Sequence, residues 1–353
     1  MQFSNVRLRR SGVTLIEVLV AIFVASIGLL ALLALFPVGA LSMKQALKDS
    51  RCAQSAANAM ALFKSMRVGL DTSLSTSTVL TDPFADGIPN TPAGLSLGLG
   101  SRSGLSANVS SYPVYVDPLG RTIKTLNDLG TSAHLPVYQD TSANAYPRII
   151  RTGVSFVQTA TPPQTLFSVY EKWFSLLDDI IFDPASPGQP ASNGISFTRD
   201  PRYTFAYMLR RPYVSNPSTF DVTIVVYSGR PINGVMSSFE EMACNKVGFG
   251  MDPTTGIATS PTTVTILYGA SGVQPQRPFI KAGGWILDAT MPDATNPNAV
   301  AQGYFYRVVD VSDNGTSLTL ELQTPVRQQI AQGMAVFLDN VVEVFEKGTV
   351  SLQ

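Results

Sequence analysis

The longest hydrophobic segment lies near the N-terminus and predicts a membrane-spanning helix. Residues 18 to 36 are nineteen positions without a charged side chain, and only Ser26 and Gly28 interrupt their apolar character. A helix of this length at about 1.5 Å per residue spans roughly 28 Å, close to the thickness of the hydrocarbon core of a bilayer. Serine and glycine are both tolerated in membrane helices, so the prediction stands despite them.

The helical pattern continues beyond the apolar segment. We predict a nearly continuous helix from about residue 14 to residue 67, with Pro37 kinking or loosening it because proline removes a backbone donor. The second half should leave the membrane and pack an alanine-rich face against a sheet. The residues predicted on that face are Ala46, Ala53, Ala56, Ala57, Met60 and Phe63.

The middle of the chain has little periodicity. Residues 69 to 200 are rich in glycine, serine, threonine and proline, which indicates loops. One stretch, near residues 166–182, places apolar side chains at helical spacing, and we predict a helix there. Asp183 and Pro184 should end that helix.

The C-terminal part alternates apolar and polar residues, as β-strands do. Residues 203–209 and 220–227 predict an antiparallel pair, with Phe220, Val222, Ile224 and Val226 on one face. Further strands are expected at 262–269, 284–289 and 335–346, together with a hairpin around Asn314-Gly315 that fits a type I′ turn. The expected fold class is α+β: a long N-terminal helix packed on an antiparallel β-sheet domain. The pattern leaves open whether the last strands form one sheet or two.

Composition and charge exclude several classes of function. The net charge is zero, with 25 basic and 25 acidic residues, so there is no electrostatic case for binding nucleic acid. The two cysteines, Cys52 and Cys244, have no metal-ligand spacing, although they could form one disulfide in an oxidising compartment. The single histidine is His134. We therefore predict no metal, no cofactor and no catalytic residue.

Charged residues near the apolar segment suggest its orientation and raise a question. Arg7, Arg9 and Arg10 precede it without any acidic neighbour, which favours a cytoplasmic N-terminus. Lys44, Lys48 and Arg51 follow it, so the count of basic residues alone does not decide the orientation. Glu17 lies at the edge of the segment, where a carboxylate costs free energy and is by default a functional candidate.

The residues around Glu17 resemble a known processing signal. A short basic leader ends in Gly12, which is followed by Val13-Thr14-Leu15-Ile16-Glu17 and an unbroken apolar helix. This pattern is similar to the N-terminus of type IV prepilins and of type II secretion pseudopilins, and most similar to their minor members. Most members of the family have phenylalanine where this chain has Val13.

The resemblance implies how the chain is processed and assembled. A prepilin peptidase would cut between Gly12 and Val13 and methylate the new amine of Val13. Thr14 and Glu17 would then serve assembly, with Glu17 pairing with the N-terminal ammonium of a neighbouring subunit. The implied partners are the peptidase, other pilin or pseudopilin subunits and the bacterial inner membrane. The implied location is single-pass, with a cytoplasmic N-terminus and a periplasmic or extracellular C-terminal domain, in a surface fibre in some members.

The predicted organisation follows from these elements. It comprises a leader at 1–12, a transmembrane and assembly helix at 13–37, the periplasmic half of the helix at 38–68, a loop-rich region at 69–200 and a β-rich domain at 201–353.

Two other readings of the N-terminus remain open. Val38-Gly39-Ala40 is a small-x-small pattern, so a signal peptidase could cut after Ala40 and release a β-rich secreted protein. An uncleaved anchor could instead carry a binding protein or an enzyme. Asp178, Asp179 and Asp183 are the residues least inconsistent with an enzyme, but Asp178 and Asp179 are adjacent and cannot face each other on a helix.

Overall fold

The fold is that of a computed structural model of the whole chain. It describes residues 14–70, 84, 110–118, 149–152, 173–174, 180–183, 196–199, 202–230, 241–269, 277–290 and 303–352. The chain divides into two units, Met1–Arg51 and Cys52–Gln353.

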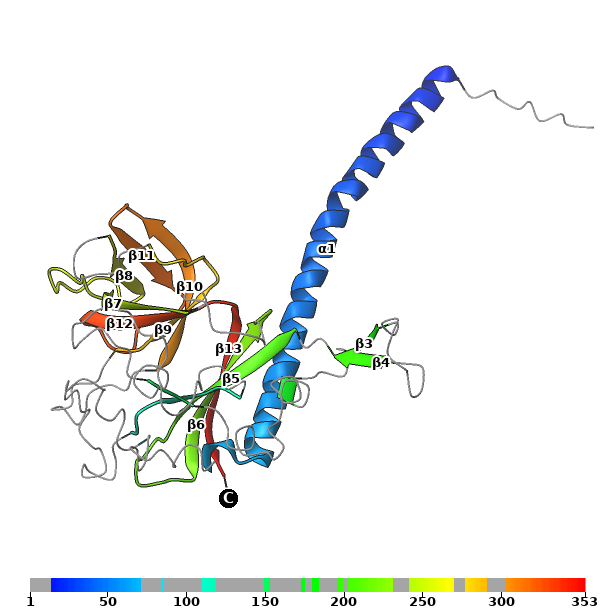
Figure 1. The fold of residues 1–353 in the computed structure, drawn as a ribbon. Coiled ribbons are helices and arrows are strands. Elements are labelled where there is room, and N and C mark those ends of the chain that lie inside the picture. Colours follow the sequence, from blue (N-terminus) through cyan, green and yellow to red (C-terminus); the bar gives the residue numbers. More distant parts are fainter. Residues whose placement is uncertain are drawn as a thin grey trace, which may run out of the picture. The chain divides into compact units, whose positions relative to one another are not determined.

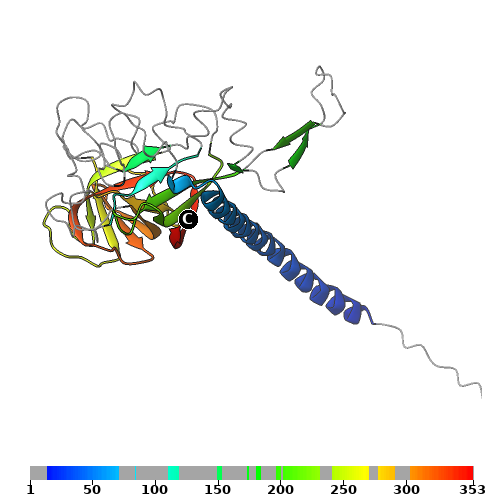
Figure 2. The ribbon, with the colours of Figure 1, turned by 90° about the horizontal axis from the view of Figure 1, so that it is seen from below.

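The first element is a single long helix, α1 (Leu15–Ser65), of 51 residues. It continues through Pro37 and is unbroken in both views of the ribbon (Figures 1 and 2). The one-turn 3₁₀ helix Val68–Leu70 follows it. The predicted helix from 14 to 67 is therefore confirmed.

The first of the two main sheets has five strands. Its order is β13 (Val341–Ser351), β6 (Thr219–Ser228), β5 (Tyr203–Arg210), β1 (Val114–Val116) and β2 (Ile150–Thr152). All neighbours are antiparallel except β1 and β2, which pair in parallel. The antiparallel pair predicted at 203–209 and 220–227 is thus confirmed as β5 and β6.

The remaining C-terminal strands close into a barrel, so the C-terminal strands form two assemblies. Their order is β10 (Tyr304–Asp313), β11 (Ser317–Leu322), β8 (Thr263–Leu267), β7 (Glu241–Phe249), β12 (Ile330–Leu338) and β9 (Trp285–Asp288). Every neighbouring pair is antiparallel. Apolar side chains such as Phe249, Ile266 and Leu320 fill a core in the barrel. The confirmed α+β layout therefore has two β-structures.

The barrel is inserted between two strands that pair with each other. Val341 of β13 is the partner of Tyr227 of β6, and the amide of Ser228 donates a hydrogen bond to the carbonyl of Asn340 at 2.9 Å. The ends of the barrel segment also lie together, because Glu241 pairs with Leu338. Asn340 makes the return turn with a φ of 63°, a conformation that asparagine adopts more readily than most residues. The helix and the five-stranded sheet thus form a continuous framework around the insertion.

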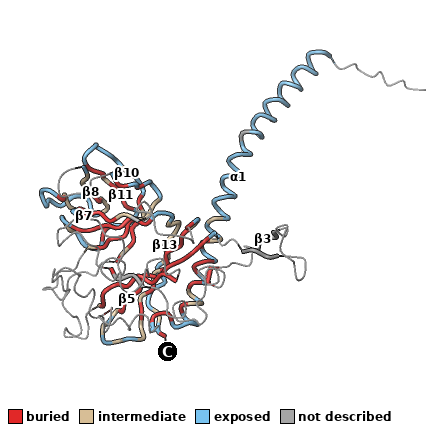
Figure 3. The backbone as a smooth tube through the Cα atoms, viewed as in Figure 1, coloured by how far each residue is buried: buried red, intermediate tan, exposed pale blue. Residues whose placement is uncertain are grey.

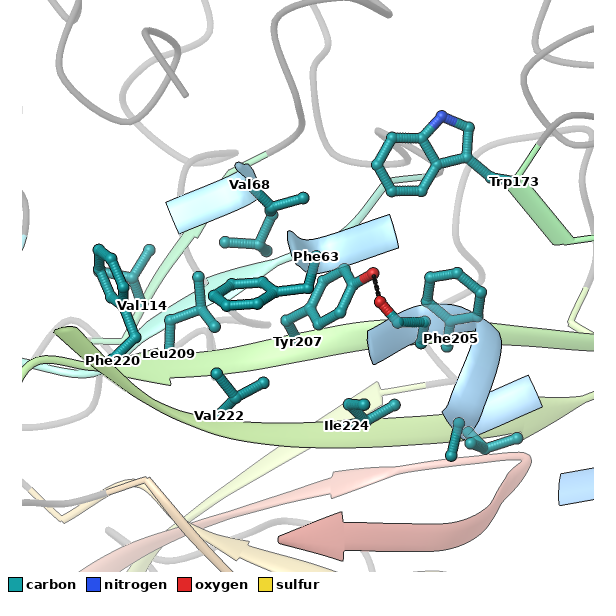
Figure 4. Packing of buried hydrophobic residues seen from close by; sticks show 14 of the residues in the cluster. Phe63, Val68, Val114, Trp173, Phe205, Tyr207, Leu209, Phe220, Val222 and Ile224 are labelled. Carbon is teal, nitrogen blue, oxygen red and sulfur yellow. Dashed lines mark hydrogen bonds between the residues drawn. The ribbon is translucent and has the colours of Figure 1, made fainter. Parts of the chain in front are cut away.

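Both faces of the five-stranded sheet are covered. On one face Phe205, Tyr207 and Leu209 of β5 pack in a core with the second half of α1 (Figure 4). On the other face Ala206 and Met208 pack in a core with barrel residues, among them Leu287 and Val336. Double coverage explains why every residue of β5 is buried.

The second half of α1 is held by packing and by one side-chain hydrogen bond. Phe63 is fully buried, with its ring centroid 5.7 Å from that of Tyr207. The Tyr207 hydroxyl donates to the carbonyl of Ala59 at 2.7 Å (Figure 4). Burial raises the pKa of Tyr207 well above its usual value, so the hydroxyl keeps the proton that this bond requires.

The buried face of the helix differs from the predicted face. Ala56 and Phe63 are buried and Met60 is partly buried, as predicted, but Ala46, Ala53 and Ala57 are exposed. The other buried positions of this face are Cys52, Ser55 and Ala59. Alanine is the best helix former on any face, so a series of alanines does not mark the side that packs.

Two other predictions from the sequence need correction. Residues 173 and 174 of the helix predicted near 166–182 are helical, but Ile180–Asp183 form strand β3, which pairs with β4 (Ser196–Arg199). The predicted helix is therefore wrong at its C-terminal end, where Ile180, Ile181 and Phe182 suit a strand as well as a helix. The rest of that segment lies outside the described residues.

The hairpin of β10 and β11 is confirmed, but not its type I′ turn. Gly315 has a φ of 89°, whereas Asn314 does not adopt a positive φ. The Asn314 side chain instead accepts hydrogen bonds from the amides of Thr316 and Ser317. This Asx-type bonding replaces the backbone geometry that a type I′ turn requires.

A buried carboxylate lies where the barrel strands β9, β10 and β12 meet. Asp288 is paired with Tyr304 on one side and Ala335 on the other. Its carboxylate accepts a hydrogen bond from the amide of Thr290 at 2.9 Å. Burial raises the pKa of Asp288 from 3.8 to about 6, an effect that the Thr290 bond and the charge of Arg210 only partly offset.

We predict that Asp288→Asn makes the globular unit more stable at neutral and alkaline pH. The native state holds the proton of Asp288 more tightly than the unfolded state, so wild-type stability falls as pH rises from about 4 to 6. Two pKa units correspond to about 3 kcal/mol, which is the largest gain expected above pH 7. The gain should be small at pH 4.

Denaturant unfolding of the full chain in detergent, followed by tryptophan fluorescence, measures this difference. Asp310→Asn is the matched control, since Asp310 is exposed on the neighbouring strand β10. A gain for Asp288→Asn that does not change with pH would contradict the prediction.

Candidate membrane and assembly segment

The N-terminal end of α1 is closed by two of the residues predicted to act in assembly. The Thr14 amide and the Thr14 hydroxyl both donate to Oε2 of Glu17, at 2.9 and 3.0 Å. The Glu17 amide in turn approaches the Thr14 hydroxyl oxygen at 3.4 Å. This reciprocal arrangement is a capping box, which satisfies backbone donors at the first turn of a helix. Thr14 therefore orients the carboxylate of Glu17.

The helix beyond Glu17 exposes its apolar side chains. From Leu15 to Leu47 the large hydrophobic residues are exposed, with Leu15 at 83% and Phe36 at 79% (Figure 3). A predominantly apolar surface of this length is unfavourable in water and favourable in lipid. By length and composition α1 is long and apolar enough to cross a membrane, and it is the one such helix among the described residues.

The charge-free stretch is longer than its most apolar part. No charged side chain occurs from Val18 to Met43, which is 26 residues, or about 39 Å of helix. The polar side chain of Ser26 is satisfied inside the helix, because its hydroxyl donates to the carbonyl of Ile22 at 2.7 Å. A bilayer would therefore not leave this hydroxyl without a hydrogen bond.

One side of the membrane segment is lined by small residues next to the carboxylate. Glu17, Val20, Ala21, Val24 and Ala25 line a shallow depression together with Ile16. Gly28 follows at helical spacing on the same side, and nothing lies within 4 Å of the position where its Cβ would be. Small side chains let a second helix approach closely in a membrane. The geometry thus places Glu17 at the end of a face suited to helix–helix contact.

Most of the remaining candidate residues lie outside the described residues, and the two cysteines lie in the cores of the globular unit. Gly12 and Val13 lie outside the described residues, as do His134, Asp178 and Asp179. Cys52 is buried in the core between helix and sheet and Cys244 in the core of the barrel. The two side chains are thiols in separate cores, which does not support the disulfide considered from the sequence.

The described part of the chain contains no group of three or more His, Cys, Asp or Glu residues that could hold a metal ion.

The capping box was not predicted from the sequence, although its signal is present there. Thr14 and Glu17 have the Thr-x-x-Glu spacing that marks a helix N-terminus before an apolar run.

Comparison with known proteins agrees with this geometry at the N-terminus. Residues 7–33 match the model of the prokaryotic N-terminal methylation motif. The chain carries a type IV pilin-like signal segment. No curated protein and no solved structure matches the chain. The matched segment covers residues 7–12, Thr14, Glu17 and most of the apolar half of α1.

We predict that Thr14→Val loosens the first turn of the pilin-like helix. Valine keeps the shape of threonine but lacks the oxygen that accepts and donates in the capping box. Loss of such a cap costs about 1 kcal/mol, so the amides of residues 15 to 17 should exchange with solvent about fivefold faster. Hydrogen exchange of the protein in detergent micelles measures the change. Thr14→Ser is the control and should exchange as wild type, and equal exchange in all three proteins would refute the role of the cap.

Proposed function

We propose that the chain is a structural subunit, a minor pilin or pseudopilin, of a type IV pilus or a type II secretion-like fibre. In this proposal prepilin peptidase cuts between Gly12 and Val13 and methylates Val13, and the subunit then assembles through the first half of α1. The observation that carries the proposal is the placement of Glu17 at the edge of the exposed apolar half of α1, within a matched methylation motif.

The physical argument concerns the charge of Glu17. Thr14 offers the carboxylate two hydrogen bonds, but both donors are neutral, so the negative charge itself is not compensated. Placing a charge in a bilayer costs a few kcal/mol on insertion scales. Pairing of the carboxylate with a cation lowers this cost. The N-terminal ammonium of a neighbouring subunit would be that cation. Pairing along the face of small residues would then fix the axial register of adjacent helices.

The large globular unit suits a subunit that is present in few copies, because its bulk does not then have to pack at every position along the fibre. The barrel of residues 241–338 is an addition to the helix–sheet framework, and its bulk favours a minor or tip position. The proposal places the N-terminus in the cytoplasm and the globular unit in the periplasm or on the fibre surface. It assigns no catalytic residue, metal or cofactor to the chain.

We predict that the mature N-terminus is N-methylated Val13 in a cell that expresses prepilin peptidase. Intact-mass and peptide mass spectrometry of the membrane fraction measure it, with a Gly12→Ala variant as the control that should remain unprocessed. An intact Met1 would point to an uncleaved anchor, and a terminus at Leu41 would point to a signal peptide. Either result would refute the proposed function.

We predict that Glu17→Ala inserts into the membrane normally but is poorly incorporated into fibres. Removing one partner of a desolvated ion pair costs about 3 kcal/mol, so the fraction of subunit in sheared fibres should fall at least tenfold. Alkaline extraction of membranes measures insertion in parallel. Asp49→Ala removes an acidic side chain beyond the apolar stretch and should assemble as wild type. Normal incorporation of Glu17→Ala would show that the carboxylate has no role in assembly.

A further inference from the structure

We infer that Lys44, Lys48 and Arg51 form a contact site for the phosphate groups of anionic lipids. The site lies at the end of the membrane segment opposite Glu17. This inference rests on the membrane placement of α1 in the proposed function, and it adds a ligand that the signal segment does not specify.

The first support is the distance along the helix. Lys44 is the first charged residue after Glu17 and lies 27 positions beyond it. At 1.5 Å per residue the separation is about 40 Å, which equals the thickness of a bilayer including its headgroups. With Glu17 at one interface, the ammonium group of Lys44 reaches the phosphate layer of the other.

The second support is the arrangement around the helix axis. The three basic residues are spaced by four and three positions, so they lie on one side of α1. Lys44 is exposed and Lys48 and Arg51 are partly exposed. The one acid in this stretch, Asp49, accepts a hydrogen bond from the side-chain amide of Gln45 at 2.8 Å. The stretch from Lys44 to Arg51 therefore carries three positive charges and one negative charge, a net charge of +2.

The third support is the distribution of charge after processing. Cleavage after Gly12 would remove Arg7, Arg9 and Arg10, and no basic side chain occurs between Val13 and Met43. Every lysine or arginine next to the mature membrane segment would then lie at its far end. Basic residues beside a membrane each contribute about 1 kcal/mol of attraction to an anionic surface. The attraction between these basic side chains and anionic headgroups would therefore be the main electrostatic interaction of the mature helix with the lipids.

Electron paramagnetic resonance with spin-labelled lipids tests the site in the full chain. The protein is reconstituted in phosphatidylcholine vesicles that contain a trace of spin-labelled phosphatidylglycerol or phosphatidylcholine. The motionally restricted fraction of each label reports its preference for the protein surface. We expect the wild type to favour phosphatidylglycerol about fivefold, and high salt to reduce that preference.

A double variant, Lys44→Gln/Lys48→Gln, should reduce the preference to near unity. The matched control is Lys64→Gln/Arg67→Gln, because Lys64 lies 20 positions, or about 30 Å of helix, beyond Lys44 and should not reach the headgroups. Inorganic phosphate and sodium chloride at equal ionic strength should weaken the preference equally if the ligand is the lipid surface. Stronger competition by phosphate would mean a free-phosphate site and overturn the inference.

The outcomes separate this inference from the proposed function. If the wild type resists alkaline extraction but shows no preference for phosphatidylglycerol, the inference fails and the membrane placement stands. The same conclusion holds if both double variants keep the wild-type preference for phosphatidylglycerol. If the wild type is extracted from the vesicles, the membrane placement and the inference fail together.

Discussion

One continuous helix has to satisfy two environments, and the rest of the structure follows from that constraint. From Leu15 to Leu47 the large apolar side chains of α1 are exposed, whereas Cys52, Ala56, Ala59 and Phe63 are buried against the sheet. Burial of apolar side chains stabilises the second half, and only a lipid or another helix can do the same for the first half. Away from the first turn and from Pro37, the backbone needs no external partner along this length, because helical amides bond within the helix.

In the globular unit, both faces of the five-stranded sheet are apolar and have to be covered. A sheet with two apolar faces needs two covers, and here α1 covers one face and the inserted barrel covers the other. Because β6 and β13 pair directly on either side of the insertion, the barrel joins the framework without interrupting the sheet. This arrangement attaches the barrel to the helix–sheet framework, and it buries Asp288 where its ionised form is disfavoured.

Two sets of charged residues among those described differ in what they contact. The pair Asp117 and Arg230 is buried, with Nη1 to Oδ1 at 3.1 Å, and Arg230 also stacks over Tyr227 at 4.5 Å, so this pair joins the strand ends within the framework. Glu17 and the basic residues after Met43 instead mark the two ends of the apolar stretch. Their spacing matches a bilayer and makes them candidates for contacts outside the chain.

The sequence alone determined the elements whose signal is local. The charge-free run, the Gly12 to Glu17 pattern and the alternation at 220–227 each lie within a few neighbouring residues, and periodicity and hydrophobicity suffice to interpret them. Only the tertiary structure decided the closure of the barrel, the buried side of α1 and the strand at Ile180–Asp183. The barrel depends on pairing between residues far apart in the chain, such as Cys244 with Ala335, and the buried side of α1 depends on its packing against the sheet. An alanine or an isoleucine fits either outcome until such partners are in place.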